Sequence, residues 1–160
     1  MNEGRFLVAL YCDDVRAEVG NKLTLVGCYG TDLLLNTFPI VLPKLAVYVR
    51  AYTPAEKPFQ KLTLRLRQND EQVIGELEFP SAQLAADAES SSPNHRWQII
   101  QAVMFASPLL VQNPGFLRLD ADTEDGPLIG SKLVIHASEN SPPSNAEATG
   151  IEADPATAPN

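Results

Sequence analysis

Short apolar segments separated by turn-forming residues are the feature that most constrains this fold. The segments are rich in Val, Ile, Leu, Tyr and Phe and are bounded by Gly, Pro, Asn or Asp, which is typical of β-strands. Little helical periodicity lies between them, so the order favours an antiparallel β-sandwich over an α/β fold. We predict about eight strands: Phe6 to Cys12, Leu23 to Tyr29, Leu45 to Tyr52, Lys61 to Gln68, Gln72 to Phe79, Trp97 to Phe105, Phe116 to Asp122 and Lys132 to Ala137.

The segment KLTLRLRQNDEQVIGELEF shows the clearest alternation of apolar and polar residues. Its leucines point to one side, and its lysine, threonine and arginines point to the other. Asn69-Asp70 supplies a two-residue hairpin turn. A hairpin closed by that turn sets Lys61 opposite Glu78, so we expect a solvated face with a cross-strand ion pair.

The segment RWQIIQAVMFA is apolar on both faces, unlike the alternating strands. Trp97, Ile99, Val103 and Phe105 fall on one face, and the other carries Ile, Ala and Met. Strands buried on both faces have this composition, so the segment is predicted to be a central strand.

Composition divides the chain into two parts. Residues 1–136 form the predicted β-sandwich domain, in which the insertion PSAQLAADAESSSPN is long enough for a turn of helix at Gln83 to Ala88. Residues 137–160 contain one Ile, four prolines and no aromatic residue. Such a segment cannot bury enough apolar area to offset its ordering entropy, so a disordered acidic C-terminal tail is predicted.

The charge balance argues against nucleic acid as a partner. The chain has 12 basic and 20 acidic residues and a net charge of −8. Binding to a phosphate backbone draws on basic groups that release counterions, and this chain has the opposite sign.

No segment predicts a membrane or export function. FLVALYC is short for a signal sequence, MNEGR has no net positive charge, and Tyr11 stands where a lipoprotein signal needs a small residue. No run approaches the ~20 apolar residues of a spanning helix. We therefore expect a soluble protein without a membrane partner, located in the cytoplasm or associated with a virion.

The two cysteines are predicted to remain reduced. If Phe6 to Cys12 pairs with Lys22 to Tyr29 as an antiparallel hairpin, Cys12 lies near Lys22 and Cys28 lies near Phe6. The thiols are then roughly 20 Å apart, too far for a disulfide. Both are expected to be buried and to behave as small apolar residues.

No motif predicts catalysis. The sequence lacks a nucleophile elbow, a Walker loop, a dinucleotide fingerprint and a paired-histidine zinc helix, so we assign no catalytic residue and no cofactor. His95 and His136 stand alone. Together with Cys12 and Cys28 they lack the close ligand spacing of a zinc site.

Two acidic segments raise the alternative of a Ca²⁺ site. The run DADTEDG, from Asp120 to Gly126, does not fit an EF-hand, because its glycine falls at the seventh position and Ser131 occupies the twelfth. Loops at one end of a sandwich would still bind Ca²⁺ if they pooled their carboxylates. That alternative uses Asp13, Asp14, Glu18, Asp120, Asp122 and Glu124.

The simpler interpretation of both acidic segments is structural. Asp125-Gly126 is typical of a hairpin turn, and the charges between Asp13 and Glu18 are expected to pair locally in a hairpin connection. A nine-residue connection of this kind offers no wall for a catalytic cleft.

The segment FPIVLPKL is a candidate protein interface. It is apolar, yet Pro39 and Pro43 cannot donate ladder hydrogen bonds, so it should follow a sheet edge or cross between sheets. Phe38, Ile40 and Leu42 then form an exposed apolar patch for a protein partner. In the alternative interpretation, the same three residues cover the open end of the core.

Three segments together suggest a family. CDDVRAEVGNKLTLVGCYG, FPIVLPKLAVYVRAYTP and NPGFLRLDADTEDGPLIGSKLVIHAS follow in this order between Phe6 and His136. The chain thereby resembles a group of bacterial and phage-associated proteins of unknown function with an Ig-like β-sandwich. The resemblance implies the fold and transfers no catalytic residue.

The expected function is therefore that of a non-enzymatic interaction or structural module. Its partner is another protein or a further copy of the chain. The alternative is a module that binds Ca²⁺ or a small ligand through the acidic end loops.

Overall fold

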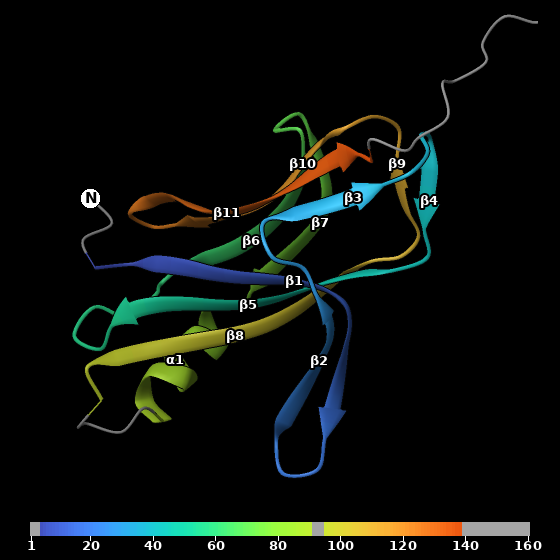
Figure 1. Cartoon of the computed structure of the whole chain (residues 1–160). Helices are drawn as coiled ribbons and strands as arrows, with labels where there is room; N and C mark the ends of the chain where they lie inside the picture. Colours follow the sequence, from blue (N-terminus) through green and yellow to red (C-terminus); the bar gives the residue numbers. More distant parts are fainter. Residues whose placement is uncertain (1–3, 91–94, 139–160) are drawn as a thin grey trace, which may run out of the picture.

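The computed structural model describes residues 4–90 and 95–138 and consists mainly of β-strands (Figure 1). All eight predicted strands are present, and three short strands were not predicted. The elements are β1 (Phe6–Glu18), β2 (Lys22–Cys28), β3 (Asp32–Leu35), β4 (Ile40–Leu42), β5 (Leu45–Pro54), β6 (Leu62–Gln68), β7 (Gln72–Phe79), α1 (Ser81–Ser90), β8 (Trp97–Ala106), β9 (Leu109–Val111), β10 (Gly115–Thr123) and β11 (Gly126–Ala137).

Two large sheets pack against each other around one core. The four-stranded sheet has the order β2-β1-β5-β8, and the five-stranded sheet has the order β3-β11-β10-β6-β7. β4 and β9 form a separate two-stranded sheet. Val47 and Val49 of β5 and Leu64 and Leu66 of β6 meet in the core. The all-β prediction is confirmed, because alternating strands bury one apolar face between the sheets.

The sequence predicted an entirely antiparallel sandwich, but one pair of strands is parallel. β3 pairs with β11 in parallel, with Asp32 opposite Val134 and Leu35 opposite Ala137. All other pairs are antiparallel. β3 and β11 are far apart in the sequence and are not joined by a hairpin, so they can pair in parallel.

The β6–β7 hairpin has a different register from the predicted one. Gln68 pairs with Gln72, so the turn holds one more residue than the two that were predicted. This extra turn residue and a register shift between Leu66 and Arg67 together set Glu78 opposite Thr63 and not opposite Lys61. A change of one residue in a turn shifts every cross-strand pair of a hairpin.

β1 is almost twice as long as predicted and changes the first hairpin. The segment from Asp13 to Glu18 continues the strand, and the turn is limited to Val19 to Asn21. Cys12 consequently lies opposite Cys28, which corrects the predicted separation of roughly 20 Å. Beyond this pair, the second half of β1 and the part of β2 before Cys28 extend away from the sandwich as a hairpin arm (Figure 1).

β8 is an edge strand, although the sequence predicted a central one. It pairs with β5 over its whole length, and no other described strand pairs with it. Its sequence is apolar on both faces. The prediction was wrong because the outer face of this strand remains exposed instead of being covered by a second layer.

The sequence also predicted a turn of helix in the insertion after Pro80 and a disordered C-terminal tail. α1 lies in the predicted insertion and buries Leu84. The tail predicted for residues 137–160 lies outside the described residues from residue 139 onward. Among the described residues, no helix has the length and apolar composition needed to span a membrane.

Candidate interaction surface

The outer face of the four-stranded sheet is apolar and exposed. Alternate residues of β1 point to this face, and Phe6, Val8 and Leu10 are 43%, 38% and 43% exposed. β5 and β8 continue the surface, because Phe6 lies opposite Tyr52 and Tyr52 lies opposite Ile99. We call this surface the outer apolar face: Phe6, Val8, Leu10, Tyr52, Trp97, Ile99, Val103 and Phe105.

Aromatic rings gather at one end of the outer apolar face. The ring of Phe6 stacks on that of Tyr52, with centroids 4.5 Å apart and an interplanar angle of 9°. Trp97 meets the same Phe6 ring edge-on at 5.6 Å. Stacked and edge-on pairs of this kind stabilise a surface that stays partly open to water.

The polar side chains on this face bond to one another. Arg50 Nε donates to the hydroxyl of Tyr48 at 2.6 Å, and that hydroxyl donates to Oε1 of Gln101 at 2.6 Å. At the other end, the ammonium of Lys44 lies 4.7 Å from the centroid of the Phe105 ring. These contacts tether the polar groups, so the apolar side chains between them remain accessible.

The free edge of β8 borders the outer apolar face. The amide of Ala55 donates to the carbonyl of Arg96 at 3.1 Å, which places Arg96 in a hydrogen-bonded pair with β5. In an antiparallel ladder such pairs alternate, so the backbone groups of Trp97, Ile99, Gln101, Val103 and Phe105 point away from β5. Among the described strands, none pairs with these groups.

Two hollows lie along this edge. One, of about 330 Å³, lies between β8 and α1, and the other, of about 480 Å³, lies between the end of β8 and β7. Gln98 lines the first hollow and is only 3% exposed, yet its amide atoms have no hydrogen-bond partner among the described residues. Within the described part of the chain, closely packed side chains therefore do not cover this edge.

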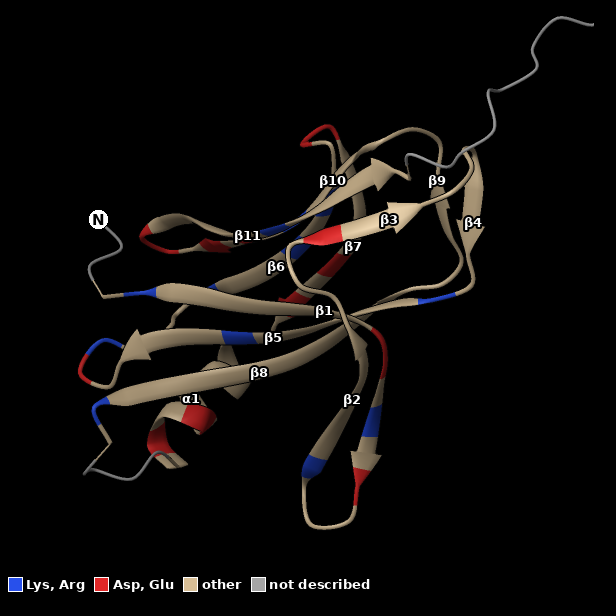
Figure 2. Ribbon diagram, in the orientation of Figure 1, with Lys and Arg blue, Asp and Glu red and all other residues tan. Residues whose placement is uncertain are grey.

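The outer face of the five-stranded sheet is charged instead. Arg65 bonds to Glu76 at 2.6 Å and also pairs with Asp122, and Arg118 bonds to Asp120 at 2.8 Å. Figure 2 shows these charges on β6, β7 and β10, whereas β8 is tan along its length. The outer face of the four-stranded sheet is thus mainly apolar, whereas that of the five-stranded sheet is charged.

The six carboxylates of the Ca²⁺ alternative do not come together. Asp120 and Asp122 lie on β10, where each bonds to an arginine, and Glu124 lies in the β10–β11 turn, where it bonds to Arg5 at 2.6 Å. Across residues 4–90 and 95–138, no group of three or more His, Cys, Asp or Glu side chains is arranged to hold a metal ion.

The other three carboxylates lie on β1 of the opposite sheet. Asp13 accepts a hydrogen bond from Tyr29, and Glu18 accepts one from Thr24 at 2.9 Å. The hydrogen bond from Lys44 lowers the pKa of the Asp14 carboxyl. The local charge pairing that the structural interpretation expected is found at Asp14, which lies 3.7 Å from Arg16 Nε, and it occurs along a strand and not in a loop.

Phe38, Ile40 and Leu42 lie at one end of the core. All three are partly buried and pack against the core cluster. In the β4–β9 sheet, the exposed apolar pair is Val41, at 55%, opposite Leu110, at 48%. The structure therefore favours the alternative interpretation, in which Phe38, Ile40 and Leu42 cover the core.

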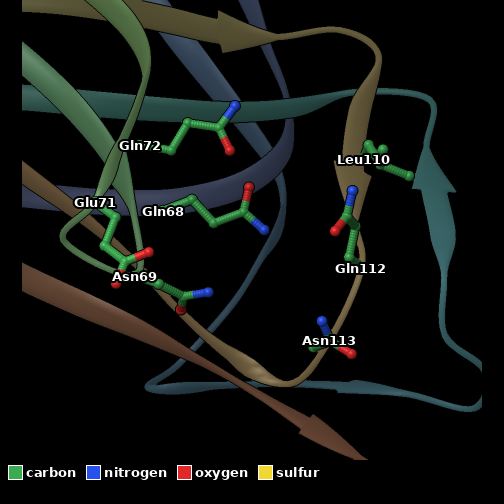
Figure 3. Close-up of a pocket in the computed structure, with 7 residues that line it drawn as sticks. All are labelled: Gln68, Asn69, Glu71, Gln72, Leu110, Gln112 and Asn113. Carbon is green, nitrogen blue, oxygen red and sulfur yellow. The ribbon is translucent and has the colours of Figure 1, made fainter.

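A polar pocket of about 270 Å³ lies beside this small sheet (Figure 3). It is lined mainly by side-chain amides, which both donate and accept hydrogen bonds and therefore suit a neutral polar group. Oδ1 of Asn69 already accepts a hydrogen bond from the amide of Phe116 at 2.9 Å. The lining residues are Gln68, Asn69, Glu71, Gln72, Leu110, Gln112 and Asn113.

The sequence contained a signal for the outer apolar face. Both the first half of β1, FLVALYC, and β8 are apolar on most alternate residues and also on most residues between them. Such a strand is either covered on both sides or exposes one apolar face, and the sequence does not distinguish the two cases.

Comparison with known proteins gives a family and no named relative. No curated protein matches the chain, and no solved structure does. Residues 7–136 match a family of unknown function, DUF6941. The match covers most of the sequence, including every described strand except the first residue of β1 and the last residue of β11. The chain therefore belongs to the DUF6941 family of unknown function.

Proposed function

We propose that this protein is a non-enzymatic structural module that assembles with a second copy of itself through the free edge of β8. The observation that carries the proposal is an uncharged, apolar edge strand of ten residues, WQIIQAVMFA. Natural proteins usually protect such edges with lysine, proline or a covering element, because an unprotected edge pairs with another chain. On the resemblance described above, we place this module in a bacterial cytoplasm or a phage particle.

The sequence of β8 is complementary to itself about Gln101. An antiparallel pair of β8 strands with a twofold axis at Gln101 sets Trp97 opposite Phe105 of the partner subunit and Ile99 opposite Val103 of the partner subunit. Aromatic pairs and aliphatic pairs then meet across the axis, each contributing roughly 0.2–1 kcal/mol. The two amides of Gln101 meet at the axis, where an amide donates and accepts equally well.

The pairing uses the backbone groups that point away from β5. It joins two four-stranded sheets into one continuous sheet, and it joins their outer apolar faces into one surface. An interface of this type is isologous and closed, so assembly stops at the dimer.

The test is the oligomeric state of the full chain, measured by sedimentation over a wide range of concentration. We expect the wild type to form a dimer of its 17.4 kDa chain and Gln101→Lys to remain monomeric, because two ammonium groups would face each other at the axis. Ile129→Lys is the matched control, since Ile129 is 63% exposed on the other sheet. It should leave the dimer intact.

A cross-link checks the register of the pair. In a Cys28→Ser background, Gln101→Cys is expected to give a disulfide-linked dimer under mild oxidation, whereas Ile129→Cys should not. A wild type that stays monomeric at every concentration, or a dimer that Gln101→Lys leaves unchanged, would overturn the proposal.

A further inference from the structure

Two cysteines face each other at the base of the hairpin arm. Cys12 of β1 is the cross-strand partner of Cys28 of β2, and both thiols are free. We infer that Cys12 and Cys28 form a redox-active dithiol, which a small-molecule disulfide such as oxidised glutathione converts to a cross-strand disulfide. This site lies on strands other than β8, so it does not depend on the proposed function.

The backbone geometry suits such a bond. The amide of Tyr29 donates to the carbonyl of Tyr11 at 2.8 Å, so these two residues form a hydrogen-bonded pair. Cys12 and Cys28, the next pair along the ladder, therefore occupy a non-hydrogen-bonded position, where Cα atoms are about 4.5 Å apart. Disulfides span Cα separations of about 4.4–6.8 Å, so the pair is within range.

A glycine gives the backbone beside Cys28 room to adjust. β2 ends at Cys28, and Gly27 has a φ of 63°, in the left-handed region that favours glycine. Asp13 and Gly27, which lie between this pair and the pair of Asp14 with Val26, are not paired with each other in the ladder. A small movement here can set the dihedral angle that a disulfide requires without disturbing the sandwich.

The two thiols differ in access to solvent, and this difference fixes the order of reaction. Cys28 is exposed and meets the oxidant first. Cys12 is fully buried, with its Sγ 3.7 Å from the carbonyl oxygen of Ala46. Burial, with a smaller contribution from the neighbouring Cys28, raises the pKa of the Cys12 thiol to about 11. Cys12 therefore acts second, as the resolving thiol.

The exchange proceeds in two balanced steps. The Cys28 thiolate attacks one sulfur of oxidised glutathione, which forms a mixed disulfide and releases one glutathione thiolate. Cys12 then loses its proton and attacks the sulfur of Cys28, which breaks the mixed disulfide and releases the second glutathione thiolate. The two protons from the cysteines pass to the two glutathione thiolates. The protein is oxidised by two electrons, and the glutathione disulfide is reduced.

The test exposes the reduced full-length chain to oxidised glutathione and follows it by intact mass and free-thiol titration. We expect the wild type to lose both thiols and about 2 Da, and dithiothreitol to restore them. Cys12→Ser should stop at one glutathione adduct, because the resolving thiol is missing. Cys28→Ser should keep its buried thiol under the same conditions. Circular dichroism checks that both variants are folded.

The pH dependence separates a resolving role of Cys12 from simple modification of Cys28. Below the raised pKa of Cys12, conversion of the wild-type adduct to the disulfide should accelerate about tenfold per pH unit. A wild type that keeps the glutathione adduct, forms only intermolecular dimers, or does not react would overturn the inference.

Discussion

Arg5 joins three segments that are far apart in the sequence. Its side chain is fully buried, donates a hydrogen bond to Glu124 at 2.6 Å and forms an ion pair with Asp125 at 2.9 Å, both in the β10–β11 turn. It also donates to Thr53 Oγ1 at 3.0 Å, and its guanidinium lies 4.7 Å from the centroid of the Phe59 ring. A buried guanidinium needs such partners, because an unpaired charge in a core is strongly destabilising.

Removal of the Glu124 charge should weaken the fold. Burial alone would raise the pKa of the Glu124 carboxyl, but the hydrogen bonds from Arg5 and from backbone amides outweigh it, and the pKa lies below its usual value. We expect Glu124→Gln to lower the free energy of unfolding by roughly 1–3 kcal/mol at pH 7, measured by urea denaturation. Glu71→Gln, at an exposed position in the β6–β7 turn, is the control.

The same pair predicts a dependence on acid. A carboxyl whose pKa is lower in the folded state stabilises the fold above its unfolded pKa, and this contribution is lost as the pH falls through the folded pKa. The wild type should therefore lose stability below about pH 4.5, and Glu124→Gln should lose less. Equal losses in the two proteins would contradict the role assigned to Glu124.

Among the elements, β4 shows how one short strand divides its residues between core and solvent. Ile40 and Leu42 pack against the core cluster, whereas Val41 between them is 55% exposed. The period of two along a strand explains this division. The exposed side of the β4–β9 sheet is consequently formed by Val41 and Leu110.

We expect aspartate substitutions in β4 to have unequal effects. Ile40→Asp places a charge against the core and should lower the unfolding free energy by roughly 1–3 kcal/mol. Val41→Asp should change it by no more than about 0.5 kcal/mol. Thermal melting of the two variants measures the difference, and similar melting temperatures would show that Ile40 does not cover the core.

Tyr11 connects the two sheets through the core. The register of β10 and β11 shifts between Arg118 and Asp120, which leaves the amide of Leu119 outside the regular ladder. That amide donates to the Tyr11 hydroxyl at 3.0 Å, and the hydroxyl donates to the carbonyl of Ser131 at 2.8 Å. The Tyr11 hydroxyl from the opposite sheet thus accepts the hydrogen bond of the Leu119 amide, which the β-bulge leaves outside the ladder.

Tyr11→Phe should therefore destabilise the sandwich. It removes both hydrogen bonds and leaves the buried Leu119 amide without an acceptor, at a cost of roughly 1–3 kcal/mol. Tyr29→Phe is the matched control, because the hydroxyl of Tyr29 bonds to Asp13 at an exposed position. Urea denaturation of the two variants measures the effect. An equal loss of unfolding free energy in both variants would show that the hydrogen bonds of Tyr11 between the sheets do not stabilise the fold.

The eight longer strands and the all-β class follow from the sequence alone, whereas the lengths of the β1–β2 and β6–β7 turns do not. Alternation in KLTLRLRQ and the apolar residues of the other segments are local properties, and each decides which side of its own strand is buried. The helix in the insertion after Pro80 was likewise predicted from the composition of its own segment. The short strands β3, β4 and β9 were not predicted, because three or four residues are too few to show a period.

The tertiary structure alone decides the register of the hairpins, the neighbours of strands that are distant in the sequence, and which faces meet water. Alternation does not specify a partner, so the pair of Cys12 with Cys28 and the edge position of β8 could not be read from their segments. The ion-pair partners of the charged residues could not be predicted either. Asp120, for example, pairs with an arginine of its own strand and with one of β6. Strand pairing depends on residues distant in the sequence, and the surface we propose as an interface exists only because of that pairing.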